Sequence, residues 1–163
     1  MLELTDTEIK ALVAEPKTWP GRGRIELRRE MRHKRADKEL EAPSGHFFRV
    51  FVRQLAEDPL DFTVGLVFRD KATGETVRLL RCNGPHRHPN RLEGETIDRA
   101  CHVHMATEKY IQANRKEDGW AYESADYRDL DSAISHFAKV TNITPIPYIG
   151  KPPADALELF NER

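Results

Sequence analysis

The sequence predicts an α+β fold, in which about five strands form one strongly twisted antiparallel sheet with two or three helices packed on one face. Between residues 46 and 82, apolar side chains alternate with polar ones, which is the period of a half-buried strand. Residues 4–13 and 130–137 instead repeat apolar side chains at helical spacing. The 163 residues are predicted to form a single domain, 1–163, that ends in an extended, proline-rich arm, 144–163.

The first helix is predicted by its cap. Thr5 and Glu8 form a capping box, in which the Glu8 side chain reaches back to the backbone amide of residue 5. The helix is expected to end before Pro16. Residues 25–31 alternate between apolar and charged side chains and predict a strand, whereas the polar residues 36–45 predict a loop.

The middle of the chain predicts an antiparallel meander. Residues 46–55 are rich in Phe and Val, and residues 62–68 alternate cleanly between apolar and other side chains. Residues 76–82 are expected to supply the partner strand after a short hairpin connection. A polar loop is expected over 83–99. A further strand is expected over 100–105, with Cys101, Val103 and Met105 facing inward and His102 and His104 facing the other way.

The last third predicts one clear helix. Leu130, Ala133, Ile134 and Phe137 recur at helical spacing, and Asp129 precedes them as a plausible N-cap. Residues 107–117 fit either a helix or a loop excursion. A short apolar patch, Ala156 to Phe160, is expected to dock on the domain or to fray.

Four of the seven histidines form two His-X-His pairs, His86 with His88 and His102 with His104. Side chains at i and i+2 of a strand point the same way, so the second pair shares one face of its strand. If strand 76–82 pairs with strand 100–105, the loop between them brings the first pair above the second. Imidazole titrates near neutrality and is the commonest metal ligand, so a chemical site is predicted here.

Three uses fit such a cluster. His86, His102 and His104 are predicted as catalytic residues for metal-free RNA cleavage, in which one imidazole removes the 2′-hydroxyl proton and another protonates the leaving oxygen. Alternatively, three imidazoles bind zinc with a water in the fourth position, or the site is purely structural. Metal-free catalysis is favoured, because no His-Glu-X-X-His motif is present. No cofactor is therefore expected, with zinc as the alternative.

Neighbouring residues are predicted to hold the substrate. Arg81 and Arg87 suit phosphate, which a guanidinium grips with two hydrogen bonds. Asn90 is assigned to the same substrate site. Trp120 is expected to stack on a base, although it also fits a core position on a strand.

Charge is distributed unevenly along the chain. Residues 17–38 hold nine basic and three acidic residues, whereas the whole chain has a net charge of −1. This segment is predicted to contact nucleic acid through Arg24, Arg28, Arg29 and Arg32. The alternative is a solvated hairpin whose charges protect a sheet edge from aggregation.

The remaining composition bears on where in the cell the protein is expected. No apolar run is long enough to cross a bilayer, so no membrane contact is expected. The N-terminus lacks the features of a signal peptide, and two cysteines are too few for a secreted disulfide scaffold. A cytoplasmic bacterial protein is predicted.

The segment from Leu79 to Asn90, LLRCNGPHRHPN, is followed by His102-Val103-His104 and by DGWAY at 118–122. Together these motifs resemble an uncharacterised bacterial family with an Arg strand, a Pro-His loop and a His-X-His strand. They are more distantly similar to the TumE-like toxins of toxin–antitoxin modules. The resemblance covers about a quarter of the chain, and Arg81, His86, His102 and His104 are its matching positions. It departs at His88, where the family pattern usually has Asn, so His88 is expected to be dispensable.

The resemblance implies a toxin or phage-defence ribonuclease of a mobile element, acting on RNA and paired with a cognate antitoxin. Two alternatives stay open. One is a non-catalytic adaptor that binds RNA or a protein partner, and the other is a zinc-binding hydrolase.

Overall fold

The computed structural model describes residues 2–152, which form three helices and eleven strands. The helices are α1 (Asp6–Ala14), α2 (Glu108–Gln112) and α3 (Leu130–Val140). The strands are β1 (Lys17–Thr18), β2 (Arg28–Glu30), β3 (His33–Glu41), β4 (Phe47–Leu55), β5 (Asp58–Arg69), β6 (Thr76–Asn83), β7 (His88–Asn90), β8 (Glu95–Ile97), β9 (His102–Met105), β10 (Trp120–Glu123) and β11 (Ile143–Thr144).

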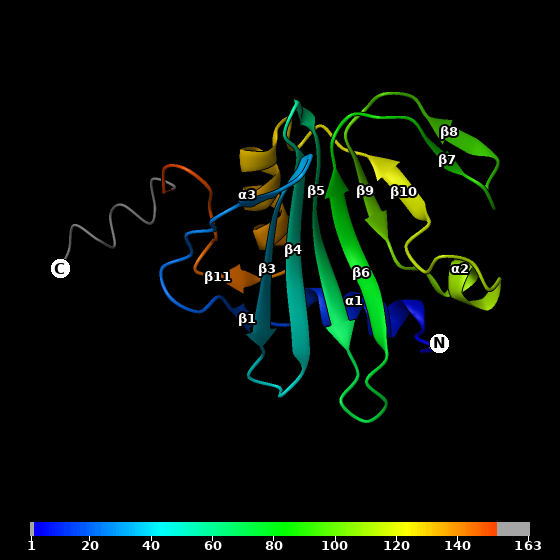
Figure 1. Cartoon of the computed structure of the whole chain (residues 1–163). Coiled ribbons are helices and arrows are strands. Elements are labelled where there is room, and N and C mark those ends of the chain that lie inside the picture. Colours follow the sequence, from blue (N-terminus) through cyan, green and yellow to red (C-terminus); the bar gives the residue numbers. More distant parts are fainter. Residues whose placement is uncertain (1, 153–163) are drawn as a thin grey trace.

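Seven strands form one antiparallel sheet in the order β10-β9-β6-β5-β4-β3-β2. Figure 1 shows the long strands crossing in front of α1 and α3, which lie behind them. The predicted α+β class is confirmed, with seven strands in the sheet rather than about five. The described residues add two small sheets, β1 with β11 and β7 with β8.

The hydrophobic core lies between the sheet and these helices. Val50, Leu66 and Leu80 are register partners on β4, β5 and β6, and none of them is more than 2% exposed. Ile134 and Phe137 of α3 belong to the same core. Burying large aliphatic and aromatic side chains contributes roughly 1.5–3 kcal/mol each, so this layer fixes which face each strand turns inward.

The opposite face of the sheet, called here the open face, is turned away from α1 and α3. Phe51, Gly65, Arg81, His104 and Ala121 are successive register partners across β4, β5, β6, β9 and β10. Because strand side chains alternate, this row lies on the face away from the core. The expected pairing of the strands at 76–82 and 100–105 is confirmed, and it places His102 and His104 on the open face.

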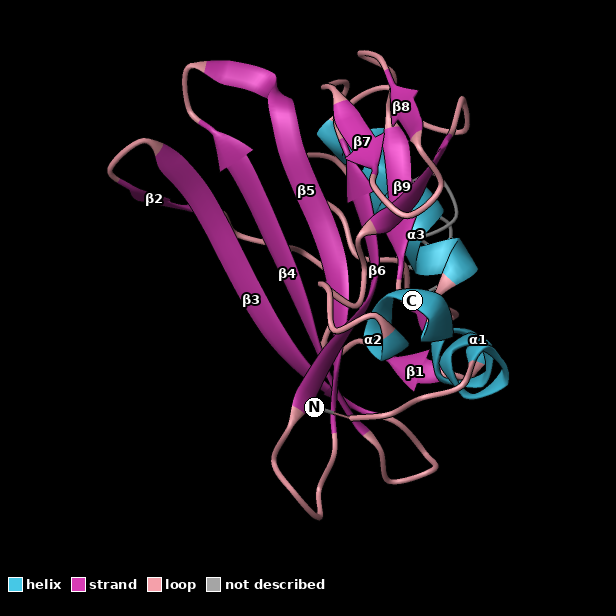
Figure 2. Cartoon of the chain, turned by 90° about the vertical axis from the view of Figure 1, so that its right-hand side faces the viewer, coloured by secondary structure: helices cyan, strands magenta, loops and turns pink. Residues whose placement is uncertain are grey.

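A short hairpin, called here the β7–β8 ribbon, stands over β9 and β10 (Figure 2). It lies within the segment 83–99, which was predicted to be a loop. The Asn90 side-chain amide donates to the backbone oxygen of Ala121 at 2.8 Å and accepts from its backbone nitrogen at 2.9 Å. One buried side chain thus mimics a strand and pins the ribbon to the edge of the sheet.

Both predicted helix caps are confirmed. Thr5 and Glu8 form the capping box of α1, and Asp129 caps α3 by accepting from the backbone nitrogen of Ser132. The ambiguous segment 107–117 contains the short helix α2, with Thr107 as its N-cap.

The prediction of a loop at 36–45 was wrong, because His33–Glu41 is the long strand β3. Its inward positions include Lys34 and Lys38, and only Leu40 is buried. A strand whose two faces both carry charge shows no apolar period, so the pattern was missed. The strand predicted at 25–31 is shorter and covers Arg28–Glu30.

The first part of the predicted arm runs beside the N-terminal segment. β11 pairs in parallel with β1, and the backbones of Gly23 and Tyr148 form a hydrogen bond at 2.8 Å. The rest of the arm, including the apolar patch Ala156 to Phe160, lies outside the described residues. Among the described helices, none has the length and apolar character needed to cross a membrane.

Lys17 ties the ends of α1 and α3 together from inside the protein. Its side chain is 1% exposed, and Nζ donates to the backbone oxygens of Val13, Glu15 and Thr141 at 2.8–2.9 Å. Burial lowers the pKa of Lys17 to about 8. The three carbonyl groups depend on this ammonium for their hydrogen bonds.

We expect Lys17→Met to lower the free energy of unfolding by roughly 2–4 kcal/mol, because it leaves buried carbonyl oxygens without a donor. Urea denaturation measures this, with exposed Lys10→Met as the matched control. The folded protein releases the Lys17 proton near pH 8 and the unfolded chain near 10.5. The wild type should therefore gain stability between these pH values relative to Lys17→Met. Equal stability of the two Met variants would contradict this role.

Candidate functional site

Four imidazoles converge on the open face, where β9 meets the β7–β8 ribbon. The ring centroid of His102 lies 4.6 Å from that of His86, 5.6 Å from His88 and 5.0 Å from His104. His88 and His104 are 4.4 Å apart. The predicted convergence of the two His-X-His pairs is confirmed, and His102 lies at its centre.

Three of the rings are oriented by the backbone. Each ring donates one N–H to a carbonyl oxygen: His88 through Nε2 to Gly119 at 2.8 Å, His102 through Nδ1 to Ala100 at 2.9 Å, and His104 through Nδ1 to Asp118 at 2.8 Å. A carbonyl oxygen only accepts, so the bonded nitrogen carries the proton. In the neutral form of each ring, the other nitrogen keeps its lone pair.

These three histidines have the arrangement of a metal-ligand set. One ligand nitrogen from each of His88, His102 and His104 lies within 4.8 Å of the other two. The Nε2 atom of His102 is buried and has no hydrogen-bond partner among the described residues. A tetrahedral zinc ion holds nitrogens roughly 3.3 Å apart, so modest side-chain rotations would close the site. Donation of the second ring N–H to a backbone carbonyl is the usual support of a ligating histidine.

Burial keeps the inner pair neutral. Desolvation lowers the pKa of His102 to about 4 and, together with the nearby Arg81, lowers that of His104 to about 2. Neither ring carries a spare proton at neutral pH. This state suits a metal ligand, and it weakens the predicted role of these two residues as general acids.

Asp118 organises the other side of the cluster. Its buried carboxylate accepts a hydrogen bond from Arg81 Nε at 2.5 Å, and its backbone oxygen orients His104. This role was not predicted. Asp118 directly precedes Gly119, and Asp-Gly is a common turn signal, so the sequence alone carried no sign of its burial.

The outer residues of the predicted site lie nearer to solvent. His86 and Arg87 are exposed, and the His86 ring meets that of His102 edge to face. Burial by its neighbours lowers the pKa of His86. His88, expected to be dispensable, is instead one of the three grouped imidazoles.

Two predicted substrate residues do not face the cluster. Asn90 is 3% exposed, and both polar atoms of its side-chain amide are hydrogen-bonded to the backbone of Ala121. Trp120 pairs in register with Met105 on the face opposite His104, and its ring lies 5.5 Å from that of Tyr122. Asn90 thus holds the ribbon to the sheet, and Trp120 lines a different cavity together with residues of α1 and α2.

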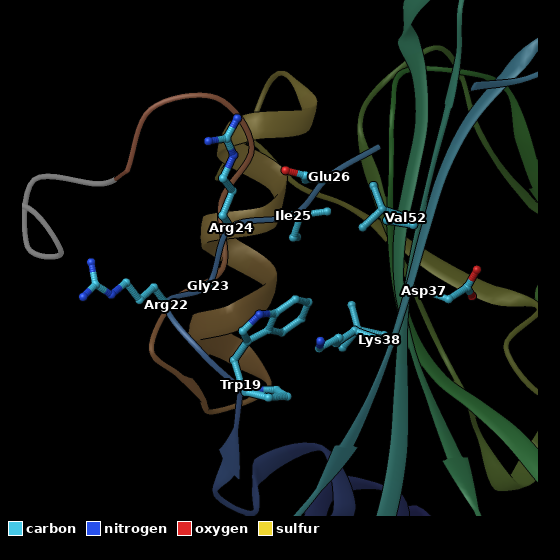
Figure 3. Close-up of a pocket in the computed structure, with 12 residues that line it drawn as sticks. Trp19, Arg22, Gly23, Arg24, Ile25, Glu26, Asp37, Lys38 and Val52 are labelled. Atoms are coloured by element: carbon cyan, nitrogen blue, oxygen red, sulfur yellow. The ribbon is translucent and has the colours of Figure 1, made fainter. Parts of the chain in front are cut away.

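The predicted nucleic-acid residues Arg24, Arg28, Arg29 and Arg32 are all exposed, and none lies at the histidine cluster. β2 forms the far edge of the sheet, and four strands lie between it and β9. Arg24 lies at the rim of a cavity of about 300 Å³ between residues 19–26 and β3 and β4. Figure 3 shows Arg24 extending away from β3, whereas Lys38 points towards Trp19.

A second cavity, of about 370 Å³, reaches His88. Arg91, Arg115 and Lys116 line it, together with Tyr110, Pro89 and Gly119, and no carboxylate is among the described lining residues. Its charge suits an anion beside a metal ligand. Arg115 and Lys116 were missed because the segment after α2 has no regular secondary structure, so no period in the sequence indicated which way they face.

Comparisons with known proteins do not assign this chain to a family. No protein-family model matches the chain, and neither a curated protein nor a solved structure is found to match it. The resemblance to TumE-like toxins therefore stays a prediction.

We expect Asp118→Asn to lower the free energy of unfolding by roughly 3 kcal/mol, because it leaves the largely buried Arg81 guanidinium without its counter-charge. Chemical denaturation measures the change, and exposed Asp126→Asn is the control. The double variant Arg81→Gln with Asp118→Asn should recover part of the loss. An Asp118→Asn protein as stable as the control would contradict the role assigned to this carboxylate.

Proposed function

We propose that this chain is a cytoplasmic metal-dependent ribonuclease, with zinc held by His88, His102 and His104. The observation that carries the proposal is the shared orientation of the three imidazoles. Each has one nitrogen fixed on a backbone carbonyl, and a nitrogen of each lies within 4.8 Å of the others. Neutral, pre-oriented nitrogens are the donors that zinc prefers.

Three protein ligands would leave the fourth position of a bound zinc ion for water, whose pKa falls to about 7 in such sites. Zinc held there would thus supply a hydroxide nucleophile for a phosphodiester. A new P–O bond would form, the bond from phosphorus to the leaving ribose oxygen would break, and that oxygen would take a proton from solvent. His86, exposed beside His102, is placed to accept the proton that the water loses.

Cations near the cluster support an anionic substrate. Arg91, Arg115 and Lys116 line the cavity that reaches His88. Arg81 is neutralised by Asp118, so a metal dication beside His104 would not face an unpaired guanidinium. The choice of RNA, and of a toxin or defence role with a cognate antitoxin, rests on the sequence resemblance.

Metal content tests the first half of the proposal. Wild-type protein purified without chelator should hold about one zinc per chain by elemental analysis, and adding zinc to the apo-protein should raise its Tm. His104→Ala should lose the metal and the Tm response. His33→Ala, a histidine outside the cluster, should keep both. Less than about 0.2 metal per chain in the wild type, with no Tm response, would overturn the zinc site.

Cleavage of a labelled RNA tests the second half. We expect the apo-protein to be inactive and zinc to restore cleavage, with His104→Ala lowering the rate at least about 100-fold. Cleavage that survives complete removal of metal would instead favour the metal-free mechanism. Metal binding and RNA binding without any cleavage would favour the adaptor.

A further inference from the structure

Arginines gather around one aromatic ring on the open face of the sheet that carries the histidine cluster. The guanidinium carbons of Arg53, Arg49 and Arg78 lie 5.5, 5.7 and 5.8 Å from the centroid of the Phe51 ring. They come from β4 and β6, and Phe51 itself is 5% exposed. The ring therefore acts as a support on which the arginine side chains rest, as cation–π geometry favours.

Gly65 makes this arrangement possible. It is the register partner of Phe51 on β5, and a Cβ there would lie 2.4 Å from Phe51 Cζ. The missing side chain lets the ring lie across the sheet instead of standing away from it. The arginine side chains are thus held close to the sheet surface.

Few carboxylates offset this charge. Asp37 pairs with Arg49 at 2.7 Å, and Glu30 lies 3.8 Å from Arg35. Within residues 2–152, Arg53 and Arg78 make no ion pair. Partial burial, together with repulsion from Arg35, Arg78 and Arg49, lowers the pKa of Arg53, whereas Asp37 opposes this shift. An added anion would relieve the repulsion among these guanidinium groups.

The register connects the arginines to the histidines. Arg28, Arg35, Arg53, Thr63, Asn83 and His102 are successive partners across β2, β3, β4, β5, β6 and β9. Four strand spacings separate Arg35 from His102, which is roughly 19 Å. A flexible polyanion lying along this row would reach the cluster.

We propose that the open face around Phe51, with Arg35, Arg53 and Arg78, binds single-stranded RNA and leads it to the histidine cluster. This inference rests on the proposed function for its choice of RNA. Guanidinium groups hold phosphates through paired hydrogen bonds and also stack on bases, so a row of them suits a polymer that presents both. The face carries arginine rather than lysine throughout this group.

Fluorescence anisotropy with a 12-nucleotide single-stranded RNA tests this, with metal-free protein so that no cleavage intervenes. The double variant Arg53→Gln with Arg78→Gln should bind about 25-fold more weakly at 0.1 M salt, because each lost phosphate contact removes about 0.7 decade there. Its plot of log affinity against log salt should be flatter by about 1.4. The matched control, Arg128→Gln with Lys139→Gln, removes the same charge from exposed positions near α3 and should bind as the wild type does.

Equal affinities of the two double variants would overturn the proposed surface. A wild type that binds duplex DNA or heparin as tightly as single-stranded RNA would overturn the choice of ligand. RNA binding through this face by a protein that takes up no zinc would leave this inference standing while the metal-dependent ribonuclease fails. If the protein takes up zinc and cleaves RNA but its RNA affinity is unchanged in the Arg53→Gln, Arg78→Gln variant, the metal-dependent ribonuclease stands and the proposed RNA surface fails.

Discussion

The pairing of β6 with β9 is the constraint on which both the core and the candidate site depend. The two strands place Cys82 against Val103 on the helix side and Arg81 against His104 on the open face. A slip of one residue would turn the imidazoles into the core and the apolar side chains out to solvent. The apolar layer thus fixes the register, and the register fixes where the histidines lie. The stability of the core and the geometry of the cluster therefore both result from the alternation of side chains between the two faces of β6 and β9.

Backbone carbonyls, rather than acidic side chains, orient the imidazoles. Ala100, Asp118 and Gly119 supply them from segments that flank β9 and β10. This keeps the net charge around these imidazole nitrogens near neutral, since Asp118, the one buried carboxylate among the described residues, is paired with Arg81. A pocket without net charge attracts a cation mainly through its metal–nitrogen bonds, and zinc binds imidazole nitrogen strongly. The near-neutral charge of the pocket and its imidazole nitrogens therefore both favour an ion such as zinc.

The sequence predicted the features that follow a regular period. The caps of α1 and α3, the meander and the face of His102 and His104 were all visible in it. β3 was missed because its inward side chains are mostly polar, and the β7–β8 ribbon because three-residue strands carry too few positions to show a period. The ion pair of Asp118 with Arg81 and the hydrogen bond of His88 with Gly119 join residues 30 or more positions apart. Such contacts depend on tertiary packing that single-sequence patterns do not encode.

The contact between Phe51 and Gly65 also has a meaning for sequence variation. The Phe51 ring occupies the space that a side chain at residue 65 would need, so the two positions are not independent. In chains that share this fold, a residue larger than glycine at position 65 should occur with a side chain smaller than Phe at position 51. Such a pair of changes would keep the sheet intact and remove the support of the arginines. Covariation at these two positions would thus mark where related chains keep or lose the basic face.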